Sequence, residues 1–118
     1  PGTFFPLCIK AWDQGRDLVA HAAPLMIIAH SRIGQSTAST DAIIAMSYLD
    51  LIAPAYGIGT CWTGIIRRAA EQSPGVVQAM GIPENHVVHA VMVCGYPLFT
   101  QFRSPRRHAL PITKRMSN

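Results

Sequence analysis

The sequence predicts an α+β fold in which a small sheet packs against helices. Residues 41–56 repeat apolar side chains at helical spacing, residues 87–94 form a continuous β-branched apolar run, and residues 25–29 form a shorter apolar run. With 118 residues, 49% of them hydrophobic, the chain has the length of one domain and enough apolar side chains for a core. We therefore expect a single domain over residues 1–118, in which residues 98–118 form an extended C-terminal arm.

The first third of the chain predicts one short helix and one strand. Residues 1–12 contain two prolines and predict a loop or a fraying remnant. Residues 13–21 predict a short helix that ends before Pro24. Residues 25–29 follow this proline and precede a polar stretch, which predicts a buried strand. Residues 31–40 are rich in Ser, Thr, Gly and Gln and predict a loop.

The long helix predicted over residues 41–56 is apolar on nearly every side. A helix of this kind normally lies in a core or in an oligomer interface. Ser39 or Thr40 is expected to cap its first turn, because a side-chain oxygen there can accept a hydrogen bond from a free backbone N–H. Pro54 is expected to kink or end the helix, and Gly57 to stop it.

The second half of the chain alternates short elements. Residues 60–63 predict an extended segment, residues 65–72 a helix, and residues 74–80 a further short helix that Ser73 and Pro74 begin. A turn over residues 81–85 precedes the strand over residues 87–94.

Charge, cysteine and histidine usage narrow the functional classes. The net charge is +4, and a basic cluster lies in the last sixteen residues, formed by Arg103, Arg106, Arg107, Lys114 and Arg115. So local a cluster suits a solvated tail or a site for one phosphate better than nucleic acid, which requires a broader basic face. The apolar runs are far shorter than the roughly 18–20 residues that span a bilayer, so no membrane partner is expected.

The cysteines and histidines predict neither a disulfide framework nor a metal site. Cys8, Cys61 and Cys94 are odd in number and widely spaced, which fits reduced cytoplasmic thiols. The five histidines show no pair at metal-ligand spacing, so we expect no metal. Cys61 is expected to be a buried small apolar side chain rather than a nucleophile.

Three motifs resemble those of the FMN-dependent nitroreductase family. Residues 57–64, Gly-Ile-Gly-Thr-Cys-Trp-Thr-Gly, are similar to its Gly-Leu-Gly-Thr-Cys-Trp signature. Residues 79–84, Ala-Met-Gly-Ile-Pro-Glu, resemble its Leu-Gly-Ile-Pro-Glu turn before a central strand. Residues 93–97, which end in Gly-Tyr-Pro, and residues 103–107, Arg-Ser-Pro-Arg-Arg, resemble its Gly-Tyr-Pro ending and downstream Arg-x-Pro-x-Arg. The motifs occur in the family's order.

The resemblance implies a fold, a reaction and partners. The fold would be a mixed sheet flanked by helices in an intertwined homodimer, with FMN at the dimer interface. The reaction would pass electrons from NAD(P)H through FMN to a small-molecule acceptor of the nitroaromatic or quinone-like class. This chain would correspond to the C-terminal half of such a protein.

The resemblance also assigns site residues, all of them cofactor-binding and none catalytic. A backbone N–H of the segment that passes along the flavin ring would lie near the flavin N5 and O4; this segment consists of Trp62, Thr63, Gly64 and Ile65. Arg103 matches the arginine that contacts the FMN phosphate, and Arg107 is a second candidate contact. From the residues alone, the same glycine-rich segment also reads as a helix stop and tight turn, with Trp62 filling a core.

Two departures from the family pattern keep a second hypothesis open. Gln101 stands where many members carry a basic residue, and the part that supplies the N-terminal half of the flavin site has no counterpart here. The alternative is a truncated, inactive dimeric fragment that binds no flavin. A basic-tailed nucleic-acid binder is a weaker third hypothesis, which predicts an affinity that falls steeply with salt.

Overall fold

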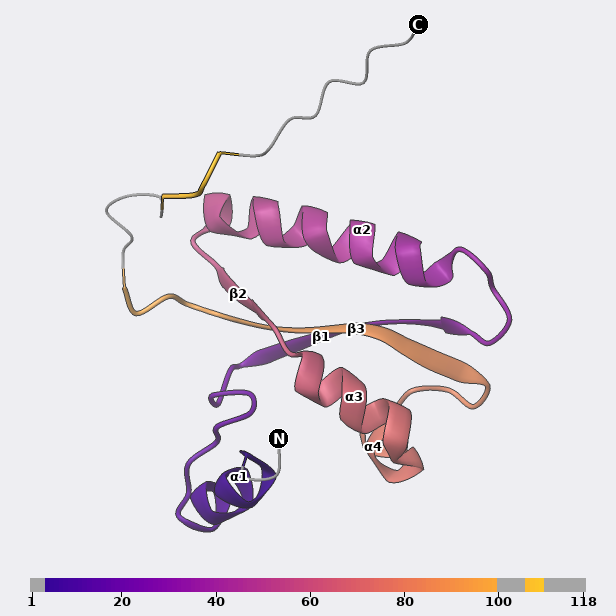
Figure 1. The fold of residues 1–118 in the computed structure, drawn as a ribbon, viewed down its shortest axis with the longest axis horizontal. Coiled ribbons are helices and arrows are strands. Elements are labelled where there is room, and N and C mark those ends of the chain that lie inside the picture. The colour runs from indigo at the N-terminus through magenta and orange to yellow at the C-terminus, as the bar shows by residue number, and fades with distance from the viewer. Residues whose placement is uncertain (1–3, 100–105, 110–118) are drawn as a thin grey trace, which may run out of the picture.

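A three-stranded antiparallel sheet forms the centre of the molecule. The computed structural model describes residues 4–99 and 106–109. The strand order is β1-β3-β2, where β1 is Leu25–Arg32, β2 is Gly59–Trp62 and β3 is His86–Gly95 (Figure 1). β3 lies in the middle and pairs with β1 on one side and β2 on the other. The predicted α+β class is confirmed, and the sheet in the described part of the chain is antiparallel throughout.

Helices cover both faces of this sheet. Figure 1 shows α2 (Ala38–Ile52) on one side, and α3 (Gly64–Gln72) with α4 (Pro74–Ala79) on the other. Successive side chains of a strand point to opposite faces, so β3 contributes to two cores. Ala90, Met92 and Cys94 pack with Met46 of α2, whereas Val88 and Val91 pack with Ala70 of α3.

The end of α2 follows the prediction and its beginning does not. A 3₁₀ turn, Ala53–Tyr56, continues the helix, and Gly57 ends it at φ 70°, where its N–H donates to the carbonyls of Ala53 and Pro54. A left-handed φ suits glycine because it has no Cβ. The prediction that Ser39 or Thr40 caps the helix is wrong: the N-cap is Thr37, and it makes no side-chain cap hydrogen bond.

Residues 4–12 do not form the predicted loop. Instead they contain most of α1 (Phe4–Asp13). Pro6 stands in the first turn of this helix, where a missing N–H costs nothing because that group has no intrahelical acceptor. The proline therefore marks a helix start here, whereas the sequence interpretation took it as a breaker.

The predicted helix over residues 13–21 is also wrong, because turns, bends and irregular backbone occupy residues 14–21. The carboxylate of Asp17 accepts backbone N–H groups of Val19 and Ala20 at 2.9 Å each and of Ala22 at 3.1 Å. Aspartate that bonds nearby backbone groups in this way competes with helix formation. His21 and Ala22 then adopt left-handed φ values of 53° and 52°.

The remaining elements match the predictions closely. β1 runs beyond residue 29 to Arg32, so the loop before α2 is shorter than expected. β2, α3, α4 and β3 confirm the predicted segments. In the described part of the chain no helix has the length and apolarity needed to cross a bilayer. Residues 100–105 and 110–118 lie outside the described residues, so the C-terminal arm stays a prediction, as does the single-domain organisation.

Candidate functional site

The segment from Trp62 to Ile65 forms the junction between β2 and α3. Trp62 ends β2, Thr63 is the N-cap of α3, and Gly64 begins the helix. The Thr63 N–H donates to the carbonyl oxygen of Val91 in β3 at 2.9 Å. This bond fixes the backbone of the junction to the central strand, so the predicted flavin-facing residues lie on a rigid part of the fold.

The Thr63 side chain is buried without a hydrogen-bond partner. Only 5% of the residue is exposed, and within the described residues its Oγ1 makes no hydrogen bond. A buried hydroxyl without a partner costs about 1–3 kcal/mol, and such groups are uncommon in folded proteins. An orphaned hydroxyl at this position fits a site that a polar ligand group completes.

The backbone next to Thr63 offers further hydrogen-bond donors. Gly64 and Ile65 belong to the first turn of α3, whose N–H groups have no acceptor within the helix. Because the Thr63 N–H points into the sheet, the alternation of an antiparallel ladder directs the Trp62 N–H to the open edge of β2. A Cβ built on Gly64 would have no atom within 4 Å, so there is open space beside the backbone. These features favour an electron-rich ligand group at the junction.

Asp50 of α2 holds the Trp62 side chain. The indole Nε1–H donates to Asp50 Oδ2 at 3.0 Å, and the Thr60 hydroxyl donates to Asp50 Oδ1. These bonds, that of Thr60 above all, lower the pKa of Asp50 despite partial desolvation. Trp62 is 38% exposed, so its role is not to fill a core. The sequence analysis did not identify Asp50 as a residue of the site. Its carboxylate in a largely apolar helix could have indicated a polar partner.

Of the two predicted phosphate contacts, only Arg107 lies among the described residues. Arg103 lies outside the described residues. Arg107 is exposed, and Figure 1 shows its segment, residues 106–109, well separated from the β2–α3 junction. Both assignments stay predictions.

The three cysteines differ in their surroundings. Cys61 is exposed, so the prediction that it is a buried apolar side chain is wrong; it lies on the open edge strand β2. Cys94 is the buried one, and desolvation, followed by the charge of Asp50, raises the pKa of its thiol. A raised pKa disfavours the thiolate, so Cys94 is a poor candidate for a nucleophile.

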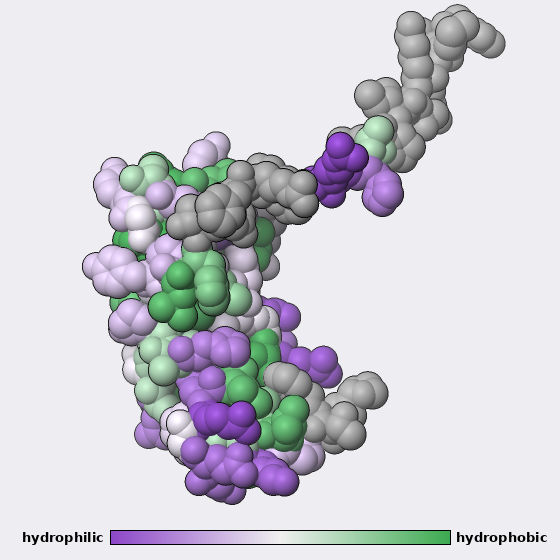
Figure 2. Space-filling view, turned by 90° about the vertical axis from the view of Figure 1, so that its left-hand side faces the viewer, coloured by the Kyte–Doolittle hydropathy of each residue, from purple (hydrophilic) through white to green (hydrophobic). Residues whose placement is uncertain are grey.

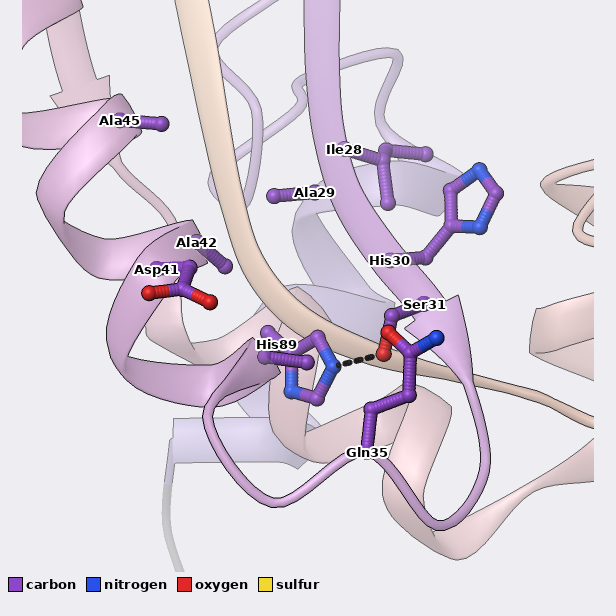
Figure 3. A pocket seen from close by; sticks show the side chains of 10 residues that line it. Ile28, Ala29, His30, Ser31, Gln35, Asp41, Ala42, Ala45 and His89 are labelled. Carbon is purple, nitrogen blue, oxygen red and sulfur yellow. Dashed lines mark hydrogen bonds between the residues drawn. The ribbon is translucent and has the colours of Figure 1, made fainter.

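A second polar region lies between the sheet and the N-terminal half of α2. Figure 3 shows a pocket of about 430 Å³ there, with Ser31 and His89 joined by a hydrogen bond between Oγ and Nε2 of 2.8 Å. Asp41 and Gln35 also line it. Within the described residues no group of three or more His, Cys, Asp and Glu is arranged to hold a metal ion.

Comparison with solved structures identifies the fold. The chain is similar to a nitroreductase with bound FMN from Bacteroides fragilis, at 24% identity and a TM-score of 0.66, over 83% of this chain and 54% of that one. It is similar to an FMN-dependent nitroreductase from Clostridium difficile, at 24% identity and a TM-score of 0.54, over 67% and 49%. An iodotyrosine deiodinase bound to FMN and 3-iodo-L-tyrosine matches at 18% identity and a TM-score of 0.60, over 92% and 59%.

This chain therefore spans about half of the length of the solved structures it matches. A comparison with curated proteins gave no match. The model of the nitroreductase family matches residues 6–96, which include the three described strands, helices α2, α3 and α4, most of α1 and the β2–α3 junction. By fold and by sequence, the chain belongs to the nitroreductase family.

Proposed function

We propose that this chain supplies part of the FMN site of an oxidoreductase of nitroreductase type. The observation that carries the proposal is the buried, unpartnered Thr63 hydroxyl at the start of α3. Family membership supports the assignment, because the junction that holds Thr63 is also the segment that resembles the family's flavin-facing signature.

The residues of the junction would bind and orient the flavin. Trp62 presents an exposed indole that Asp50 holds in place. The first-turn N–H groups of Gly64 and Ile65 are donors suited to ring atoms that gain negative charge on reduction. Flavin, when bound, supplies the redox chemistry, and the protein supplies binding, orientation and electrostatics. No side chain at the junction is required to act as an acid or a base.

The substrates follow from the family resemblance alone. NAD(P)H is the proposed electron donor, and a nitroaromatic or quinone-like compound is the proposed acceptor. An open junction on an edge strand is compatible with two substrates that use the same flavin face in turn. A site in the cytoplasm, where these donors are abundant, fits the three cysteines, for which we propose the free thiol form.

The site would be completed by a second copy of the chain. α2 exposes large apolar side chains that the described part of the chain leaves uncovered: Ile43 at 43%, Ile44 at 51%, Tyr48 at 72%, Leu51 at 80% and Ile52 at 54%. Figure 2 shows apolar surface in the upper part of the molecule, where α2 lies, and in the lower part, where α1 lies. Exposed apolar area of this extent is typical of an interface, and we propose a homodimer.

Thr63→Val tests the flavin site. Valine keeps the shape of threonine and removes the hydroxyl, so we expect the dissociation constant for FMN to rise about three- to tenfold, the worth of one hydrogen bond. The FMN-free variant should be at least as stable as the parent chain, because an unsatisfied buried group is lost. Fluorescence titration with FMN and chemical denaturation measure the two effects.

Thr37→Val is the matched control, since Thr37 is exposed and its side chain makes no cap hydrogen bond. Equal FMN affinities for the two variants would refute the role of Thr63. A parent chain that stays colourless after incubation with FMN and removal of the excess would favour the other hypothesis, an inactive fragment that binds no flavin.

A further inference from the structure

Two histidines from different strands meet on the face of the sheet that α3 and α4 cover. His30 lies on β1 beside a register shift between Ala29 and His30, and His86 begins β3. Their Nδ1 atoms are 2.8 Å apart, and their ring centroids are 5.0 Å apart with an angle of 52° between the rings. Neither ring takes part in the proposed flavin site, so this pair requires its own explanation.

The contact between the two Nδ1 atoms has a simple chemical consequence. In a neutral imidazole, each ring nitrogen carries either a proton or a lone pair. A hydrogen bond between the two Nδ1 atoms therefore requires a proton on one and a lone pair on the other. A metal ion could take the place of that single proton. Because metal–nitrogen bonds are longer than half of the Nδ1–Nδ1 distance, the ion would lie beside the line between the nitrogens, and both rings would turn to direct their lone pairs at it as a two-nitrogen chelate.

The separation of the two nitrogens favours one coordination geometry. Metal–nitrogen bonds to histidine are about 2.0–2.1 Å long, so two neighbouring ligands at 90° lie about 2.9 Å apart, whereas two tetrahedral ligands lie about 3.3–3.4 Å apart. The observed 2.8 Å is closer to the first value. Square-planar and tetragonal nitrogen sites are typical of Cu²⁺ and Ni²⁺.

We propose that His30 and His86 together bind one Cu²⁺ or Ni²⁺ ion through their Nδ1 atoms. Water would complete the coordination, because the described residues offer no third histidine, cysteine or carboxylate positioned as a ligand. The charges nearby are mixed. Arg32 is the register partner of His86, and Glu71 and Glu84 line a cavity of about 520 Å³ together with His86. Glu71 is ion-paired with Arg67 at 2.6 Å.

The site was not predictable from the spacing of the histidines. His30 and His86 are fifty-six residues apart, and only the antiparallel register of β1 and β3 brings them together. His89, three residues from His86, bonds Ser31 and does not join the pair. This arrangement supplies a matched control on the same two strands.

Calorimetric titration with Ni²⁺ at about pH 7.5 tests the proposal, since Ni²⁺ does not oxidise the exposed Cys61 thiol as Cu²⁺ does. The parent chain should bind one equivalent, and His30→Gln and His86→Gln should each weaken binding at least tenfold. Glutamine retains a polar atom near the Nε2 position and has none at Nδ1, so each variant removes one proposed ligand. His89→Gln should bind Ni²⁺ as the parent does.

Two further measurements keep the proposal falsifiable. Circular dichroism must show folded variants, and thermal unfolding of the parent chain should shift upward with Ni²⁺ while that of the two variants does not. Ni²⁺ affinity should fall toward pH 5.5, because protons compete for both nitrogens. Absence of Ni²⁺ binding by the parent, or an equal loss in His89→Gln, would overturn the site and leave the pair as a shared-proton contact only.

Discussion

At the scale of single residues, Asp50 connects stability to the candidate site. Its carboxylate accepts from Thr60 and Trp62, and these bonds lower its pKa in the folded chain. A carboxyl whose pKa is lower when folded stabilises the fold above the unfolded-state pKa, near 4, and this contribution is lost as pH falls through the folded value. Asp17, whose pKa its backbone N–H contacts also lower, acts in the same direction.

Asp50→Asn should therefore make the free energy of unfolding less dependent on pH in the acid range. The parent chain is expected to lose more stability than the variant between about pH 5 and pH 3, as measured by urea unfolding at each pH. Asp17 is present in both proteins, so their difference reports Asp50. Asp13→Asn, at the exposed end of α1, should follow the parent. Parallel curves for the parent and Asp50→Asn would contradict this role.

The cysteines allow a second residue-scale prediction. In the folded chain the exposed Cys61 should react with a thiol-specific aromatic disulfide within minutes, whereas the buried Cys94, whose pKa is raised, should react only after unfolding. Absorbance of the released thiolate follows both phases. A Cys61→Ser variant should lose the fast phase attributable to that residue, and fast modification of Cys94 would show that the core around Met92 opens readily.

Most of what sequence analysis missed lies at this scale. The Asp50–Trp62 contact joins α2 to β2 through a turn whose geometry depends on Gly57, and no periodicity encodes that turn's direction. The burial of Thr63 likewise arises from packing on β3. The identities of the flavin-segment residues were predicted, but the features that support their role appear only in three dimensions.

At the scale of elements, strong local patterns predicted what long-range contacts later confirmed. β3 was predictable because its β-branched run is buried on both faces. α1 was not, because the sequence interpretation gave Pro6 more weight than the apolar residues around it. The Asp17 turn was missed for a related reason, since side-chain bonding to the backbone overrides weak helix propensity.

Two glycine substitutions, one at a left-handed φ and one inside a helix, test whether Gly57 is needed at the end of the α2 segment. Gly57→Ala should destabilise the chain by about 1 kcal/mol, because alanine is strained at its φ of 70°. Gly75→Ala, inside α4, meets only an ordinary contact at 3.7 Å and should be neutral or stabilise by up to about 1 kcal/mol. Urea unfolding of both variants and of the parent chain measures the two changes in the free energy of unfolding. Equal effects would mean that Gly57 tolerates a Cβ and that the end of α2 is set by Pro54 instead.

At the scale of the whole molecule, the apolar surface of α2 is the proposed dimer interface. Leu51 is 80% exposed, and Leu51→Glu should raise the dimer dissociation constant at least tenfold by placing a charge in the proposed interface. Sedimentation velocity over a concentration series measures this change. Ile33→Glu, at a residue that is 64% exposed in the loop after β1, should leave the association unchanged. A parent chain that is monomeric at all concentrations would refute the homodimer.

The strand order has a consequence for synthesis of the protein. Among the described strands β3 is made after β1 and β2, and it is the partner of both in the described sheet. In a nascent chain that ends before residue 86, β1 and β2 therefore lack the strand with which they pair. Their apolar side chains stay exposed until β3 is made or a chaperone binds them. Folding on the ribosome should be abrupt, with the sheet forming in one step after residue 95 emerges.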